Sequence, residues 1–129
     1  MKALEYDITV TANYLDDLNH VNNVVYVQWV NDIAKAHWEK VASQHIKNKY
    51  FWVLMSHTID YKKAAVLNDT ITVKTYIIES SSITSLRAVD MYNTETKELV
   101  AQSKTKWCFM NALTQRPTRI TPEIEELFN

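Results

Sequence analysis

The sequence predicts an α+β fold in which a curved antiparallel sheet wraps around one long central helix. Residues 22–42 contain no glycine or proline, and their apolar side chains cover nearly the whole circumference of a helix. Four later segments are rich in the β-branched and aromatic residues that favour strands. Short polar links join these segments, as in hairpins. Because a helix that is apolar on most sides must be buried, the sheet is expected to enclose it.

The individual elements follow in chain order. Loose alternation predicts a first strand over residues 4–11, and a polar loop follows over residues 13–19. The helix over 22–42 is expected to be deepest in its first half, because Lys35, Glu39 and Lys40 give the second half a wet side. The sheet is then completed by strands over 51–62, 70–79, 83–93 and 98–111. A proline followed by acidic residues predicts a short terminal helix over residues 122–128.

Composition indicates an ordinary globular protein. The 129 residues fit a single domain over residues 1–129, with 47% apolar residues, 22% charged residues and a net charge of -1. No basic field indicates nucleic-acid binding, and no segment reaches the roughly 20 apolar residues of a membrane span. The N-terminus lacks the apolar region of a signal peptide, and Cys108 is the one cysteine. We therefore expect a cytoplasmic protein.

The absence of glycine disfavours several classes of catalytic and nucleotide-binding site. Phosphate-binding loops, dinucleotide-binding fingerprints and the nucleophile elbow of α/β hydrolases all need glycine for tight turns or close backbone approach. His37 and His45 have no third ligand at a recognisable spacing, so no metal site is predicted. No organic cofactor is predicted either.

The most informative segment joins the first loop to the helix. It contains Asp16, three further residues, the run from His20 through Val21 and Asn22 to Asn23, and Tyr26 three positions later. This pattern resembles the signature of the hot-dog thioesterases. It is similar to the 4-hydroxybenzoyl-CoA thioesterase group of bacteria and, through Trp29 as well, to the acyl-ACP thioesterases of plants. The resemblance implies a hot-dog fold and hydrolysis of an acyl-CoA or acyl-ACP thioester.

The motif supplies what thioester hydrolysis needs, which is an attacking group and donors for the oxyanion that forms. Asp16 is expected to act as nucleophile or general base, and the helix start near Asn22 and Asn23 offers free amides. His20 is a candidate for orienting the carboxylate or the acyl carbonyl. Each residue also has a structural explanation, since asparagine caps helices and aspartate is common in turns. The joint spacing favours the catalytic interpretation.

Substrate-binding candidates lie within and beyond the motif. Tyr26, Trp29 and Leu54 are expected to line either the core or an acyl pocket. Lys62, Lys63 and Arg87 are candidates for contacting CoA phosphates at the mouth of that pocket. For any one of the lysines, a solvated position at a strand end is the simpler alternative.

Three departures from the family patterns bear on mechanism. Asn19 replaces the glycine that usually precedes the histidine, so it is expected to adopt unusual backbone angles. Where the plant acyl-ACP enzymes carry asparagine this chain has Leu18, and it has Ala64 and Ala65 where they carry glutamate and cysteine. These differences favour a mechanism centred on Asp16, and CoA over ACP.

Other functions remain as alternatives. The chain could be an acyl-ACP thioesterase, a lyase acting on acyl thioesters, or a non-catalytic acyl-thioester-binding protein; the lyases' histidine-centred motifs with proline and glycine are missing. An exposed edge strand and a sheet around a single helix also predict a homodimer or homotetramer.

Overall fold

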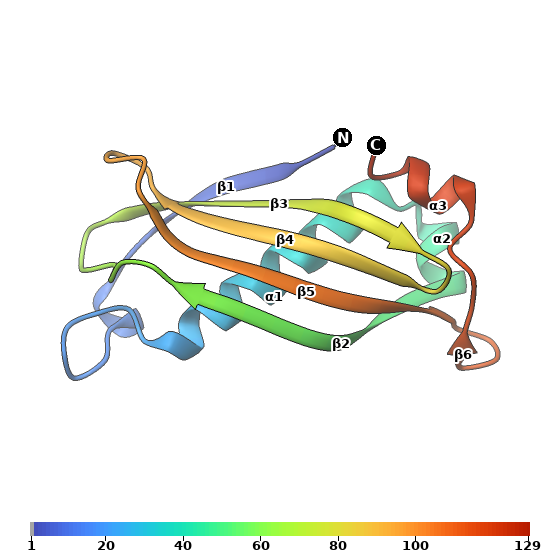
Figure 1. The fold of residues 1–129 in the computed structure, drawn as a ribbon, viewed down its shortest axis with the longest axis horizontal. Coiled ribbons are helices and arrows are strands. Elements are labelled where there is room, and N and C mark those ends of the chain that lie inside the picture. The colour runs from blue at the N-terminus through green and yellow to red at the C-terminus, as the bar shows by residue number, and fades with distance from the viewer. Residues whose placement is uncertain (1) are drawn as a thin grey trace.

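The computed structural model describes residues 2–129 and contains one curved sheet with a long helix lying across one face (Figure 1). The elements run in the order β1 (Leu4–Thr9), η1 (Ala12–Tyr14), α1 (Asn23–Val41), α2 (Gln44–Lys49), β2 (Tyr50–Tyr61), β3 (Thr70–Ser81), β4 (Thr84–Asn93), β5 (Leu99–Asn111), β6 (Arg116–Pro117) and α3 (Pro122–Glu126). The predicted α+β class is confirmed, and the predicted strands and helices agree with these bounds to within two residues. The short elements η1, α2 and β6 were not predicted.

Every strand pairing in the sheet is antiparallel. The strand order is β1-β3-β4-β5-β2, and β6 adds a short pairing to β5. The pairings of β2 and β3 each contain one register shift, between Leu54 and Ser56 and between Ile77 and Glu79. Such irregularities bend strands and increase their twist, which suits a sheet that curves around a helix.

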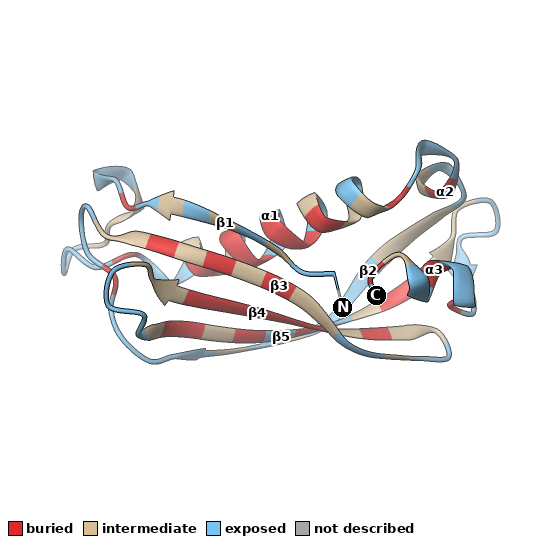
Figure 2. Cartoon of the chain, turned by 90° about the horizontal axis from the view of Figure 1, so that it is seen from above, coloured by how far each residue is buried: buried red, intermediate tan, exposed pale blue. Residues whose placement is uncertain are grey.

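The core lies between α1 and the concave face of the sheet. Figure 2 shows buried residues along the side of α1 that faces the sheet and along β3, β4 and β5. Val30 and Ile33 of α1 are fully buried against Val73, Val89 and Met91. A second cluster forms around the fully buried Phe109, where Ile46 of α2 and Ile124 of α3 close the end of the molecule.

The helix is less enclosed than its apolar sequence predicts. Its buried residues run from Tyr26 to His37, whereas Val24 in the first turn is 72% exposed. The expectation that the first half is the deeper one is therefore wrong for the first turn. The physical reason is that the sheet covers only one side of α1: Tyr26 in the first turn is 3% exposed, whereas Val24 is not on the covered side.

The strand β2 forms one edge of the sheet and carries exposed apolar side chains. Val53, Leu54 and Met55 are 43%, 39% and 56% exposed, respectively. No helix within residues 2–129 has both the length and the hydropathy needed to cross a membrane.

Candidate active site

The loop before α1 is closed by its own backbone. The Asp16 amide donates to the His20 carbonyl at 2.8 Å, and the Asn19 amide donates to the Asp16 carbonyl at 3.0 Å. Asn19 has a φ of 62°, as expected for the residue that replaces glycine. Asparagine tolerates this left-handed conformation better than most residues. The local sequence therefore folds residues 16–20 into a tight, hydrogen-bonded turn.

The Asp16 carboxylate is held within this turn. Its Oδ1 accepts hydrogen bonds from the Leu18 amide at 2.9 Å and the His20 amide at 3.2 Å. Its Oδ2 has no hydrogen-bond partner among residues 2–129, and the residue is half-buried. One oxygen therefore fixes the side chain while the other remains free to react.

The first turn of α1 offers one free amide. Asn22 is the N-cap, and its Oδ1 accepts from the Val24 amide at 3.0 Å. The Val25 amide donates to the Asn22 carbonyl at 2.9 Å, and the Asn22 amide donates to the Tyr14 carbonyl at 2.9 Å. Within the described chain, the Asn23 amide is thus left without a partner at the positive end of the helix dipole.

Contacts from distant segments hold the turn against the helix. The Val21 amide donates to the Ala65 carbonyl at 2.9 Å, and the Ala65 amide donates to the Tyr26 hydroxyl at 3.3 Å. The Tyr61 hydroxyl donates to the Asn23 carbonyl at 3.4 Å. These bonds connect the end of β2 and the following loop to both parts of the motif.

The Tyr26 hydroxyl on the first turn of α1 has a raised pKa. Burial raises the pKa of the Tyr26 hydroxyl, and the nearby charges of Asp69 and Asp16 raise it further. The hydrogen bond with the Ala65 amide acts in the opposite direction.

Of three further residues predicted for the site, two are exposed at the surface and one lies in the core. The His20 side chain is exposed and makes no hydrogen bond within residues 2–129. Trp29 is a core residue, 3% exposed, whose ring packs edge-on to Tyr14 at 5.5 Å and Tyr26 at 5.4 Å. Leu54 lies exposed on the edge strand β2.

The two lysines after β2 differ in their contacts. Both are exposed, and both follow Tyr61, whose hydroxyl contacts the first turn of α1. Lys63 forms an ion pair with Glu98 at 2.9 Å, whereas Lys62 forms no ion pair within the described residues. The Lys62 charge is therefore not paired with a carboxylate of the described residues.

The expected position of Arg87 at a solvated pocket mouth is wrong. Arg87 is only 5% exposed, because it lies on the concave face of β4 beneath α1. Its Nη1 donates to His37 Nδ1 at 2.9 Å and to Thr75 Oγ1 at 2.9 Å. Burial lowers the pKa of the guanidinium to about 10. Burial and the Arg87 charge lower the pKa of His37 to about 4, so this imidazole is neutral at pH 7.

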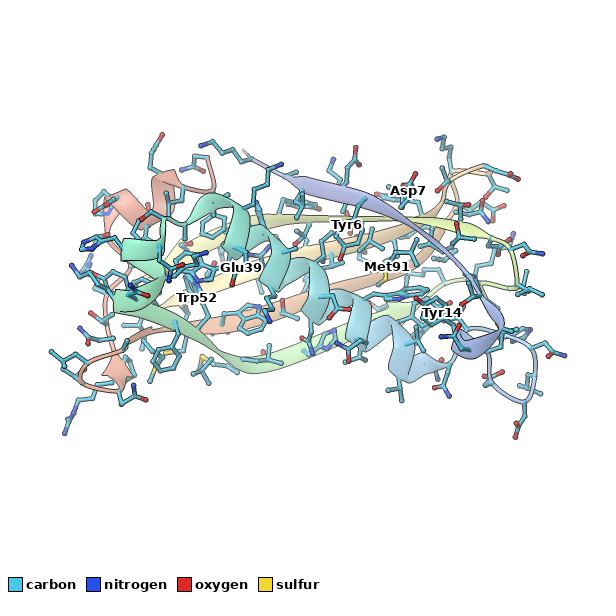
Figure 3. The ribbon with its side chains drawn as sticks, turned by 180° about the vertical axis from the view of Figure 1, so that it is seen from behind. Tyr6, Asp7, Tyr14, Glu39, Trp52 and Met91 are labelled. Atoms are coloured by element: carbon cyan, nitrogen blue, oxygen red, sulfur yellow. The ribbon has the colours of Figure 1, made fainter. Side chains whose placement is uncertain are left out.

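A cavity at the other end of α1 was not predicted. It has a volume of about 290 Å³, and its lining includes Trp38, Trp52, Trp107 and Arg87. Trp52 and Glu39 lie toward the end that carries α2 and α3, far from Tyr14 beside the turn (Figure 3). The sequence did contain a pattern that indicates the buried position of Arg87. Alternation along β4 places Arg87 on the same face of the strand as the core residues Val89 and Met91.

The fold and the turn together define a class of protein. A sheet wrapped around a central helix, with a carboxylate in the turn before the helix and a free amide at the helix start, is the architecture of the hot-dog thioester hydrolases. The chain belongs to the acyl-ACP thioesterase N-terminal domain family, which matches residues 4–128. The predicted resemblance is therefore confirmed, and the chain is a thioester hydrolase by family.

Solved structures share the fold at low sequence identity. A 1,4-dihydroxy-2-naphthoyl-CoA thioesterase from Synechocystis is 14% identical, with a TM-score of 0.83 over 98% of this chain and 96% of that one. A Staphylococcus aureus protein, solved in complex with CoA, is 17% identical, with a TM-score of 0.85 over 98% of this chain and 81% of that one. A DHNA-CoA thioesterase from Staphylococcus aureus is 19% identical, with a TM-score of 0.81 over 99% and 89%. No curated protein sequence matches the chain.

Proposed function

We propose that this protein hydrolyses acyl-CoA thioesters to the free acid and CoA in the cytoplasm, working as a homo-oligomer. The observation that carries the proposal is that one short segment holds two groups without a partner among residues 2–129, the Oδ2 of Asp16 and the amide of Asn23 at the start of α1. Together they supply the attacking group and the oxyanion donor that the reaction requires.

The proposed reaction starts with the thioester oxygen accepting a hydrogen bond from the Asn23 amide. Asp16 then attacks the carbonyl carbon directly, or removes a proton from a water molecule that attacks it. Negative charge develops on the oxygen, next to the amide and the positive end of the helix dipole. The C–S bond breaks, and the thiolate leaves and takes up a proton. In the direct route, water then hydrolyses the acyl-aspartyl anhydride and regenerates Asp16.

Two observations support CoA as the carrier. Lys62 directly follows Tyr61 and forms no ion pair within the described residues, so its charge suits a phosphate. Ala64 and Ala65 stand where the plant acyl-ACP enzymes carry glutamate and cysteine, and Ala65 is fully buried. The structural relative solved with CoA provides a further argument for this carrier. The family name supports the alternative, an acyl-ACP substrate.

The homo-oligomer is supported by the edge strand β2. Its exposed apolar residues and unpaired backbone groups are costly to leave in water. Antiparallel pairing of two β2 strands about their exposed middle would set the end of one beside the beginning of the other. Tyr61 and the adjacent catalytic turn would then lie beside the beginning of the partner's β2.

The direct test is thiol release from a panel of acyl-CoA substrates by the wild type, Asp16→Asn and Asp17→Asn. Asp17 is the matched control, because it is the neighbouring carboxylate and is exposed. We expect Asp16→Asn to lower kcat by about 10²-fold or more, the usual contribution of a general base, and Asp17→Asn to retain activity. Equal activity in all three proteins would exclude the proposed role of Asp16.

The carrier is tested separately with one acyl group attached to CoA, pantetheine or ACP. We expect Lys62→Ala to raise KM for acyl-CoA while leaving KM for acyl-pantetheine unchanged. Lys63→Ala is the control, since Glu98 already pairs with that charge. A higher kcat/KM for acyl-ACP than for acyl-CoA would favour the ACP alternative.

A further inference from the structure

The most unusual group outside the catalytic turn is the buried guanidinium of Arg87. Taking a charge out of water is costly unless an opposite charge compensates it. Among residues 2–129, the ion pairs are Lys47 with Glu39 and Lys63 with Glu98, so Arg87 has no carboxylate partner. Its partners, His37 and Thr75, are neutral at pH 7. The folded protein therefore buries a cation without an anion.

The hydrogen bonds of Arg87 leave one edge of the guanidinium free. Both bonds involve Nη1, and because arginine only donates, His37 Nδ1 must be the acceptor. Nε and Nη2 have no partner within the described residues. Neither nitrogen is fully buried. In this they differ from His37 Nε2, His57 Nε2 and Ser103 Oγ, which are fully buried and have no partner. Since Arg87 lines the cavity, these two donors retain access to it.

The cavity around this edge is small and aromatic. Its volume of about 290 Å³ is near the lower limit of small-molecule sites, about 300 Å³. Trp38 and Trp52 form one wall, with ring centroids 5.7 Å apart, and Phe128 packs against Trp38 and lies 5.7 Å from the guanidinium carbon. The indole nitrogen of Trp107 donates to Thr105 at 2.9 Å, so it is not available to a ligand.

The charged residues at the rim leave the site cationic. Glu39 is the acidic residue of the lining, and it is already bonded to Lys47 at 2.8 Å. Lys35 also lies at the rim and forms no ion pair within residues 2–129. A bound anion would thus meet a buried guanidinium below and a second positive charge near the opening.

We propose that this cavity is a binding site for a small organic carboxylate with an aromatic body. The two carboxylate oxygens match the Nε and Nη2 donors in a bidentate pair, and the ring packs against the wall formed by Trp38 and Trp52. The carboxylate also supplies the missing opposite charge.

The site is separate from the catalytic turn of the same chain. Lys35 follows Asn23 by 12 residues, which places it about 18 Å further along the axis of α1. Because a carboxylate probe carries no thioester, its binding can be measured without any hydrolysis, so this test and the thiol-release test of Asp16 can fail separately.

Benzoate is the probe, and benzamide is the matched neutral control because it has the same ring and shape. Calorimetry and thermal-shift measurements on the full chain should show saturable benzoate binding, with benzamide binding at least about tenfold more weakly, as expected for a lost charge-assisted hydrogen bond. Inorganic phosphate tests whether any anion suffices, and we expect it to bind more weakly than benzoate. Equal binding of benzoate and benzamide, tighter binding of phosphate, or no saturable benzoate binding would overturn the proposal.

Two pairs of variants locate the binding. Arg87→Met should abolish the preference for benzoate over benzamide, whereas Arg87→Lys should retain part of it. Ala34→Leu introduces extra side-chain atoms into the cavity and should block both ligands, while Ala36→Leu, on α1 outside the lining, should not. If Arg87→Met does not fold, the Ala34 and Ala36 pair still decides the location. Unchanged benzoate binding in Ala34→Leu would place the ligand elsewhere and refute this site.

Discussion

Substitution of Asn22 separates the structural role of the helix start from its electrostatic role. Asn22→Ala removes the cap on the Val24 amide, which costs about 1 kcal/mol. For 129 residues the unfolding entropy is about 0.27 kcal/mol/K, so the melting temperature should fall by about 4 °C. Because the amide of Asn23 is unaffected, we expect kcat to change little.

Asn22→Asp should have the opposite pattern. Aspartate caps as well as asparagine, and its charge interacts favourably with the helix dipole, so stability should be retained. The same charge opposes the oxyanion that forms beside the Asn23 amide. At a separation of about 7 Å and an effective dielectric constant of about 20, the repulsion is roughly 2 kcal/mol. This corresponds to a loss of about 30-fold in kcat.

The two variants are compared by thermal unfolding and by single-turnover thiol release at saturating substrate. A stable Asn22→Asp protein with low kcat, beside a destabilised Asn22→Ala protein with near-normal kcat, is the expected result. If Asn22→Asp retains full kcat, the start of α1 does not stabilise the transition state. If Asn22→Ala loses as much activity as Asn22→Asp, Asn22 itself takes part in the reaction.

Three further predictions concern stability and assembly. Tyr26→Phe removes the hydroxyl that accepts a hydrogen bond from the buried Ala65 amide. The free energy of unfolding, measured in urea, should fall by about 1–3 kcal/mol. An unchanged urea midpoint would show that this hydrogen bond contributes nothing to stability. His37 has a folded pKa of about 4 against 6.5 when unfolded, so the unfolded chain binds more protons and stability falls as the pH drops from 6.5 towards 4. Between pH 7.5 and 5 this loss should be about 2 kcal/mol, and His37→Gln should remove it; an identical pH dependence in the variant would contradict the low pKa. Leu54→Lys on the edge strand β2 should shift the protein to a monomer in sedimentation at micromolar concentration. Thr58→Lys on the same strand serves as the control. An unchanged oligomeric state in Leu54→Lys would place the interface elsewhere.

The local features of this protein could be predicted from its amino-acid sequence. The apolar run of α1, the four long strands and the capping role of Asn22 depend on side-chain periodicity and local hydrogen bonding, which are encoded by neighbouring residues. The positive φ of Asn19 follows for the same reason, because its neighbours impose a turn that few residues tolerate. The spacing from Asp16 to Tyr26 was likewise sufficient to indicate the thioesterase family.

Contacts between groups far apart in the sequence could not be predicted in this way, because they depend on how the elements pack. Arg87 and His37 are 50 residues apart, and their contact depends on how α1 docks across the sheet and on the register of β3 with β4. The same docking brings Ala65 to Tyr26 and leaves the Asn23 amide free. Periodicity tells which face of a strand or helix is buried, but not which residue of another element lies opposite it. Alternation could therefore place Arg87 inside the sheet, whereas its neutral partners and the aromatic cavity beside it follow from the packing of α1, β2 and α3 together.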